Sequence, residues 1–177
     1  MISFHNDPAI KDFYLARIKK HYELDEITKG VYYKETPDGK IQACGVGCTL
    51  HSANHAAYET ELGIPEVLAH LEDTIFENLP NADAKTWPIR FIEAIPVGAD
   101  LSLVWFKFAH WLLVDPEHGV IRFNSHDAIK NVGNLFARHI KGDIPKTNEW
   151  AAAGAAAGDA ARAAAGDAAR AADAAWA

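Results

Sequence analysis

Both cysteines of the chain lie in one short run, and two histidines follow them closely. The four residues are Cys44, Cys48, His51 and His55. A helix that starts near Gly47 would place the last three on one face, at positions i, i+3 and i+7. The first cysteine can fold back over that face, and two thiols with two imidazoles form a ligand set that tetrahedral zinc prefers. The run therefore predicts a structural zinc site made of these four residues.

Carboxylates that follow the histidine pair could orient its imidazole rings. Glu59 lies four residues after His55, and Glu72 lies on the next expected helix. Metal-bound histidines commonly donate their second ring N–H to such an acceptor. We therefore expect Glu59 and Glu72 to support the zinc site, with a solvated acidic surface as the alternative interpretation.

The cysteine run also permits two interpretations without a metal. Cys48 follows a glycine at a helix start, where the helix dipole lowers the pKa of a thiol. It could then be the nucleophile of a cysteine-dependent hydrolase with a histidine base, although His51 as that base would leave little room for a substrate. In the other interpretation Cys48 is a small buried apolar residue, and the histidines are ordinary polar helix residues.

The composition excludes several classes of protein. Of the 177 residues, 49% are hydrophobic, which is enough for a folded core, and the net charge is −7. An acidic balance argues against nucleic acid as the main ligand and fits a partner with a basic surface. The longest apolar stretch, Leu101 to Val114, contains Lys107 and His110 and is too short for a membrane span of roughly 20 residues. With no export signal visible and two closely spaced cysteines, we expect a cytoplasmic protein that does not bind membranes.

The spacing of apolar residues predicts a mainly α fold. We expect one helical globular domain over residues 1–145, with a small β-hairpin, and an Ala-rich helical extension over 146–177. A Pro-Asp-Gly turn at 37–39 predicts the hairpin, which would deliver Cys44 to the next helix. A short strand is expected at 120–123. The expected helices begin or run at about 8–22, 48–62, 65–79, 87–95, 101–114 and 127–140.

The C-terminal extension has a composition of its own. An eight-residue unit that starts at Gly158 is repeated from Gly166, and each copy carries Asp and Arg at i, i+3. Alanine is the best helix former, and such ion pairs add a few tenths of a kcal/mol each. We expect a helix that is solvated or packed on the domain, with self-association through this helix as the alternative.

Four segments of the chain together resemble a known group of proteins. They are Gly47-Cys48-Thr-Leu-His51, Tyr58-Glu59-x-Glu61-Leu-Gly63-Ile-Pro65, Leu71-Glu72-Asp73-x-Ile75-Phe76-Glu77 and Gly98-Ala-Asp100-Leu-Ser102. The group consists of uncharacterised bacterial and prophage proteins with Ala-rich C-terminal repeats, some of which are labelled immunity proteins. The resemblance implies a phage- or defence-associated protein, and it implies no catalytic residues.

These observations lead to one expected function and one alternative. We expect a non-enzymatic protein-binding or inhibitor protein, with the zinc site as a structural element and a toxin or host-defence component as the partner. The alternative is the cysteine-dependent hydrolase that uses Cys48. The two interpretations differ in the state of the thiols, because a metal-bound thiolate and a free nucleophile react differently with alkylating reagents.

Overall fold

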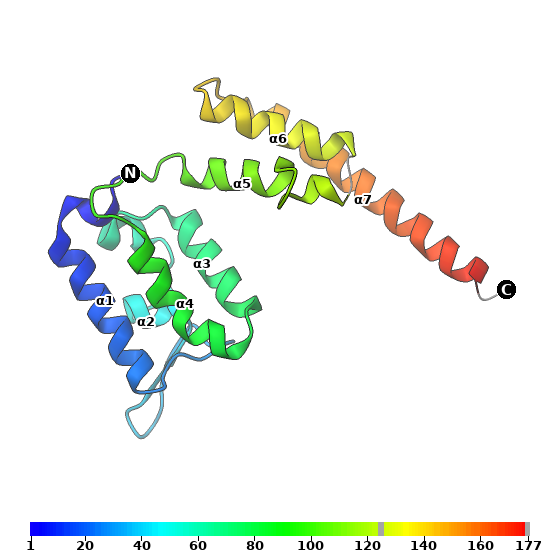
Figure 1. The fold of residues 1–177 in the computed structure, drawn as a ribbon. Coiled ribbons are helices and arrows are strands. Elements are labelled where there is room, and N and C mark those ends of the chain that lie inside the picture. The colour runs from blue at the N-terminus through cyan, green and yellow to red at the C-terminus, as the bar shows by residue number, and fades with distance from the viewer. Residues whose placement is uncertain (124–125, 176–177) are drawn as a thin grey trace. The chain divides into compact units, whose positions relative to one another are not determined.

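The computed structural model describes residues 1–123 and 126–175, with side chains described as far as residue 163. The fold is mainly helical, with a two-stranded antiparallel hairpin and a long C-terminal helix, as predicted (Figure 1). The chain groups into two compact units, Met1–Ser102 and Leu103–Ala177. We describe each unit by itself.

Unit 1 is built around a short buried helix. Its elements are η1 (Ser3–Asn6), α1 (Pro8–Glu23), β1 (Tyr33–Glu35), β2 (Ile41–Ala43), α2 (Gly45–Leu50), the π-helix η2 (Tyr58–Leu62), α3 (Glu66–Asn78) and α4 (Asn81–Ala94). All six residues of α2 are buried, and α2 contacts α1, α3 and α4. The run that contains the cysteines and histidines of the predicted zinc site therefore begins in the core of this unit.

The start of α1 and the hairpin confirm local sequence signals. Asp7 caps α1 by accepting a hydrogen bond from Ala9 N at 2.8 Å, and Pro8 fills the first helical position. β1 and β2 pair in antiparallel register around the 36–40 turn. The hairpin delivers Cys44 to the start of α2, where Cys44 is the N-cap residue.

The predicted helix over 48–62 is wrong, because α2 ends at Leu50. His51 has a φ of 55°, in the left-handed region, and its N–H donates to Gly47 O at 2.8 Å. The Ser52 hydroxyl then accepts a hydrogen bond from Asn54 N at 3.1 Å. Short polar side chains that bond to the nearby backbone compete with helix continuation. His55 consequently lies in a loop, and the i, i+3, i+7 face on which the zinc prediction depended does not form.

The fourth helix begins six residues before its expected start near Trp87. α4 starts at Asn81, and Pro88 lies inside it. Proline in a helix removes one backbone hydrogen bond and crowds the preceding turn. Pro88 is nonetheless buried against α2, where a Cβ built on Gly45 would lie 2.8 Å from Pro88 Cγ. Tertiary packing therefore outweighs the local preference against proline here.

Unit 2 is a set of helices joined by aromatic contacts. Its elements are α5 (Val104–Val114), η3 (Val120–Arg122), α6 (Asp127–Ile140) and α7 (Thr147–Ala175). α6 packs against both α5 and α7. The Phe106 ring stacks on His139 at 3.6 Å, and the Phe136 ring meets Trp150 edge-on at 4.8 Å. The strand expected at 120–123 is wrong, because Phe123 N bonds back to Val120 O and closes a 3-10 turn.

The C-terminal helix begins at Thr147, one residue after the predicted start of the extension at 146. Arg138 at the end of α6 pairs with Asp143 and with Glu149 of α7, which fixes the turn between the two helices. The ion pair expected between Asp159 and Arg162 is present. The second expected pair, in the repeat from Gly166, and residues 176–177 lie outside what is described. No helix in the described part of the chain combines the length and the apolar character needed to cross a membrane.

Candidate functional site

The two cysteines are buried and hydrogen-bonded to the backbone. Cys44 Sγ accepts from Gly47 N at 3.5 Å and lies 3.8 Å from Tyr32 O. Cys48 Sγ donates to Ala43 O at 3.5 Å, and its residue has no exposed surface. Burial raises the pKa of Cys44 to about 12 and moves the pKa of Cys48 well above its usual value. Both residues are therefore neutral thiols that fill the core at physiological pH.

The structure gives the two histidines of the predicted zinc site different partners. His51 Nε2 lies 2.7 Å from His21 Nε2. His55 Nε2 lies 3.7 Å from a carboxylate oxygen of Asp73. Within residues 1–123 and 126–175, no group of three or more His, Cys, Asp or Glu side chains has a metal-binding arrangement. The described residues therefore do not bring Cys44, Cys48, His51 and His55 together as one ligand set, and the zinc site stays a prediction from spacing.

The two carboxylates expected beside His55 also bond elsewhere. Glu59 Oε1 accepts from the backbone N of Glu66 at 3.1 Å, near the start of α3. Glu72 is fully buried and accepts from the Tyr58 hydroxyl at 2.7 Å. Burial raises the pKa of Glu72 to about 8, although the hydrogen bond from Tyr58 opposes the shift. The carboxylate that does approach His55 is Asp73, the neighbour of Glu72 in the sequence.

Three polar side chains, those of Glu26, His21 and His51, form a chain of contacts that the sequence analysis did not predict. Glu26 Oε2 lies 2.6 Å from His21 Nδ1, and both residues are buried. The other oxygen of Glu26 accepts from Ile41 N at 3.2 Å. A carboxylate can only accept, so His21 Nδ1 carries a proton, and when the His21 ring is neutral its Nε2 accepts from His51 Nε2. The pattern near the cysteines does not reveal this chain, because His21 and Glu26 lie more than 20 residues upstream of His51.

The environment of His51 keeps its imidazole neutral. Burial lowers the pKa of His51, and the nearby Arg17 guanidinium lowers it further. Arg17 itself donates to Thr49 O at 2.8 Å, which ties α1 to the end of α2. The Tyr33 ring lies 5.7 Å from the His51 ring. His51 is thus a neutral imidazole whose Nε2 faces His21 Nε2.

These histidines line a cavity of unit 1, which we call the α1 groove. It has a volume of about 560 Å³. Its wall is one face of α1, with residues at helical spacing, together with residues that follow α1 in the chain. The lining residues are Phe13, Ala16, Arg17, Lys20, His21, Leu24, Glu26, Ile41 and His51. Phe13 is 55% exposed and Leu24 is 54% exposed, so apolar surface is open to solvent beside two cationic side chains.

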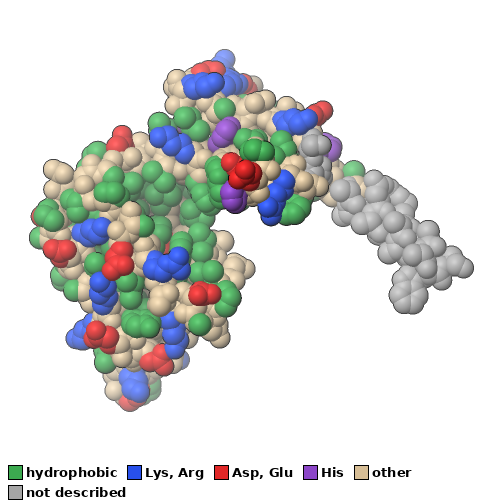
Figure 2. All heavy atoms as spheres, viewed as in Figure 1, with side chains coloured by type: hydrophobic (Ala, Val, Ile, Leu, Met, Phe, Trp, Pro, Cys, Tyr) green, Lys and Arg blue, Asp and Glu red, His purple; other side chains and the backbone are tan. Residues whose placement is uncertain are grey.

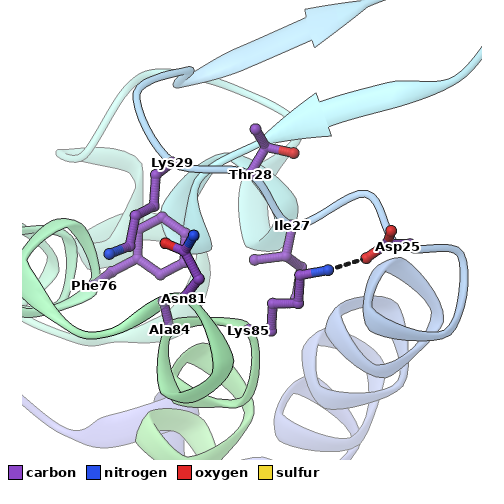
Figure 3. A pocket seen from close by; sticks show the side chains of 8 residues that line it. All are labelled: Asp25, Ile27, Thr28, Lys29, Phe76, Asn81, Ala84 and Lys85. Carbon is purple, nitrogen blue, oxygen red and sulfur yellow. Dashed lines mark hydrogen bonds and ion pairs between the residues drawn. The ribbon is translucent and has the colours of Figure 1, made fainter.

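A second cavity of unit 1, of about 310 Å³, lies between the segment after α1 and the adjoining ends of α3 and α4 (Figure 3). Phe76 and Ile27 form apolar parts of its wall. Lys85 points to Asp25 and pairs with it, and Lys29 donates to Leu79 O. Both ammonium groups therefore already have acceptors. This cavity offers a ligand fewer groups to bind than the α1 groove does.

The surface charge of the chain is mixed on the face shown in Figure 2. Lys and Arg side chains alternate there with Asp and Glu, with hydrophobic side chains between them. A nucleic-acid backbone needs clustered cations. The view therefore agrees with the net charge of −7 in giving no support to a nucleic-acid interface.

Comparison with models of known families, with curated proteins and with solved structures finds no match for this chain. The resemblance to immunity proteins consequently stays a prediction. The function must be argued from the geometry of the described residues.

Proposed function

We propose that the protein is a non-enzymatic binding protein that recognises a partner protein through the α1 groove. The segment recognised would carry an aromatic or aliphatic anchor next to acidic residues. The observation that carries this proposal is the open apolar wall of the groove with Arg17 and Lys20 beside it.

The apolar part of the groove supports binding of an anchor side chain. Phe13 and Leu24 expose more than half of their surface at opposite ends of this α1 face. Burying one large apolar side chain contributes about 1.5–3 kcal/mol. A groove of about 560 Å³ has room for one such side chain and its neighbours.

The charged part of the groove supports an acidic partner segment. Arg17 and Lys20 lie on adjacent turns of α1, and the Arg17 guanidinium stacks over the Phe13 ring at 4.6 Å. Glu26 is the one carboxylate among the lining residues, and it is occupied by His21 and Ile41 N. Complementary charges increase association rates and exclude wrong partners. The groove is therefore selective for carboxylates beside the anchor.

The alternative, a cysteine-dependent hydrolase, receives less support from the geometry. A nucleophilic cysteine needs an accessible thiol with a lowered pKa. Cys48 has no exposed surface and a raised pKa, and its Sγ bonds to a backbone carbonyl. A toxin or a host-defence component remains the partner that the sequence resemblance favours.

Peptide display against the folded protein tests the proposal. We expect the selected peptides to share a large apolar residue flanked by Asp or Glu. Lys20→Glu and Leu24→Ser should each weaken the affinity of a selected peptide by about tenfold. Lys34→Glu and Tyr22→Ser are matched controls, because these residues are exposed and lie outside the groove. Peptides that bind all four variants equally well would rule out the α1 groove as the binding site.

A further inference from the structure

Two histidine side chains of unit 1 bring ring nitrogens together at the α1 groove. The rings of His21 and His51 meet edge-on with their centroids 4.9 Å apart, and their Nε2 atoms lie 2.7 Å from each other. Both residues line the groove. Imidazole nitrogens are good ligands for Zn²⁺, Cu²⁺ and Ni²⁺. The pair therefore offers two such ligands at one point of an open cavity.

Glu26 prepares His21 to act as a ligand. Glu26 Oε2 lies 2.6 Å from His21 Nδ1, and both residues are buried. A proton on Nδ1 leaves the Nε2 atom of the neutral ring with a free lone pair. The other Glu26 oxygen accepts from Ile41 N, so the carboxylate is itself held in place. A fixed carboxylate behind the far nitrogen is the usual outer partner of a metal-bound histidine.

His51 has a strained backbone and a side chain that can move. It is the C-cap residue of α2 with a φ of 55°, a position where glycine is the common residue. Such strained residues cluster at functional sites. Two nitrogens bound to one tetrahedral zinc ion lie about 3.3 Å apart. His51 is exposed, so a small rotation of its side chain can supply this separation.

The charges around the pair act in both directions. Glu26 favours a cation beside His21, whereas Arg17 and Lys20 in the groove wall oppose one. Burial and the Arg17 guanidinium lower the pKa of His51, so protons compete little with a metal ion at neutral pH. In the described part of the chain, no third His, Cys, Asp or Glu completes a ligand set. The remaining coordination positions therefore belong to water or to an anion that Arg17 and Lys20 attract.

We propose that His21 and His51 bind one divalent transition-metal ion of the Zn²⁺, Cu²⁺ and Ni²⁺ class through their Nε2 atoms, with Glu26 as a positioning residue. The ion replaces the hydrogen bond between the rings, and the ring proton of His51 moves from Nε2 to Nδ1, so the charge of the ring does not change. This site differs from the one predicted from spacing, because it uses neither thiol. It does not depend on the proposed function of the groove, because the ion needs no partner protein.

Titration of the full chain, without a His-tag, with ZnCl₂ tests the proposal. Calorimetry measures the affinity, and long-range ¹H–¹⁵N spectra of the imidazoles locate the ion. We expect saturable binding of one ion with an affinity in about the micromolar range, weaker than at a structural site with four protein ligands. The coordination shifts should appear at Nε2 of His21 and His51. Ca²⁺, which prefers oxygen ligands, should produce neither heat nor shifts at the same concentration.

Variants identify the ligands. His51→Asn should weaken Zn²⁺ binding by at least about tenfold, and it should fold because asparagine tolerates the left-handed conformation. Glu26→Gln keeps an acceptor for His21 but removes the charge. It should weaken binding by about tenfold, with the coordination shifts still at the same two nitrogens. His118→Asn, which changes an exposed histidine of unit 2, is the matched control and should bind like the wild type.

Three results would overturn the proposal. The first is the absence of saturable Zn²⁺ binding up to about 1 mM. The second is equal binding by His51→Asn and wild type, which would mean adventitious binding at other histidines. The third is loss of binding in Cys48→Ala without coordination shifts at His21, which would favour the cysteine site predicted from spacing. Equal binding by Glu26→Gln and wild type would overturn the role assigned to Glu26.

Discussion

The Nε2 atoms of His21 and His51 lie 2.7 Å apart, so one imidazole must donate a hydrogen bond to the other. Glu26 decides the direction, because its carboxylate can accept but not donate and it lies 2.6 Å from His21 Nδ1. When the His21 ring is neutral, its Nε2 has only a lone pair, and His51 is then the donor. The buried carboxylate of Glu26 thereby sets the orientation of His51 at the α1 groove, through the His21 ring between them.

We expect Glu26→Ala to destabilise unit 1 by about 2–3 kcal/mol, because it leaves the buried His21 Nδ1 and the partly buried Ile41 N without their acceptor. The free energy of unfolding in urea measures the effect. Glu35→Ala, at an exposed position of β1, is the control and should change stability by less than about 0.5 kcal/mol. Equal losses in the two variants would contradict the role assigned to Glu26.

Glu72 should make the stability of the protein depend on pH. Its pKa is about 8 in the folded chain and 4.5 in the unfolded chain, so between these values the folded state binds more protons. Stability then falls as pH rises from about 4.5 to about 8, by at most roughly 1.4 kcal/mol per pH unit for this one group. Glu72→Gln should remove this component and be more stable than the wild type at pH 8 and above, relative to pH 5.

The measurement for Glu72 is the difference in unfolding free energy between variant and wild type at pH 5 and at pH 8.5. Glu23→Gln, an exposed carboxylate at the end of α1, is the control and should show no such difference. A difference for Glu72→Gln that is independent of pH would mean that the carboxyl is not neutral in the folded protein.

Both thiols should resist iodoacetamide at neutral pH until the chain unfolds, because Cys44 and Cys48 are buried and protonated. Mass spectrometry of the alkylated protein measures this. Addition of a chelator should not change the rate. Labelling that begins only after chelation would support the zinc prediction, and rapid labelling of Cys48 in the native protein would support the hydrolase.

Gly47→Ala should prevent normal packing of α2. A Cβ at this position would lie 1.6 Å from the backbone oxygen of Tyr32, and backbone cannot give way as a side chain can. We expect a loss of more than about 3 kcal/mol, measured by thermal or urea unfolding. Gly154→Ala is the control, because α7 has open space there, and it should stabilise the helix by up to about 1 kcal/mol. A Gly47→Ala protein with wild-type stability would show that the hairpin and α2 are not in close contact.

The parts of the fold that were predicted correctly depend on interactions between near neighbours in the sequence. Asp7 and Pro8 begin α1, and the Pro-Asp-Gly turn forms the hairpin, because capping and turn formation each involve only a few residues. The prediction of a helix over 48–62 was wrong for a local reason too. The hydrogen bond from Asn54 N to the Ser52 hydroxyl competes with continuation of the helix, although the periodic pattern of the sequence looked continuous.

The candidate sites depend on pairs of residues that are distant in the sequence. His21 with His51, and His55 with Asp73, meet only after α1 and α3 pack around α2. The sequence analysis singled out His51 and His55 as zinc ligands, but the spacing that suggested a shared metal held no information on these partners. The partners of both histidines could therefore be inferred only from the folded chain.

The burial of α2 has a consequence for how unit 1 folds. Six residues, two of them glycine, are too few to form a stable helix in water. α2 acquires its stability from α1, which precedes it, and from α3 and α4, which follow it. Fragments that end before α4 or begin after α1 lack part of this enclosure, so they should not retain a folded α2. Unit 1 should fold and unfold as one cooperative body, with its central helix among the last elements to become ordered.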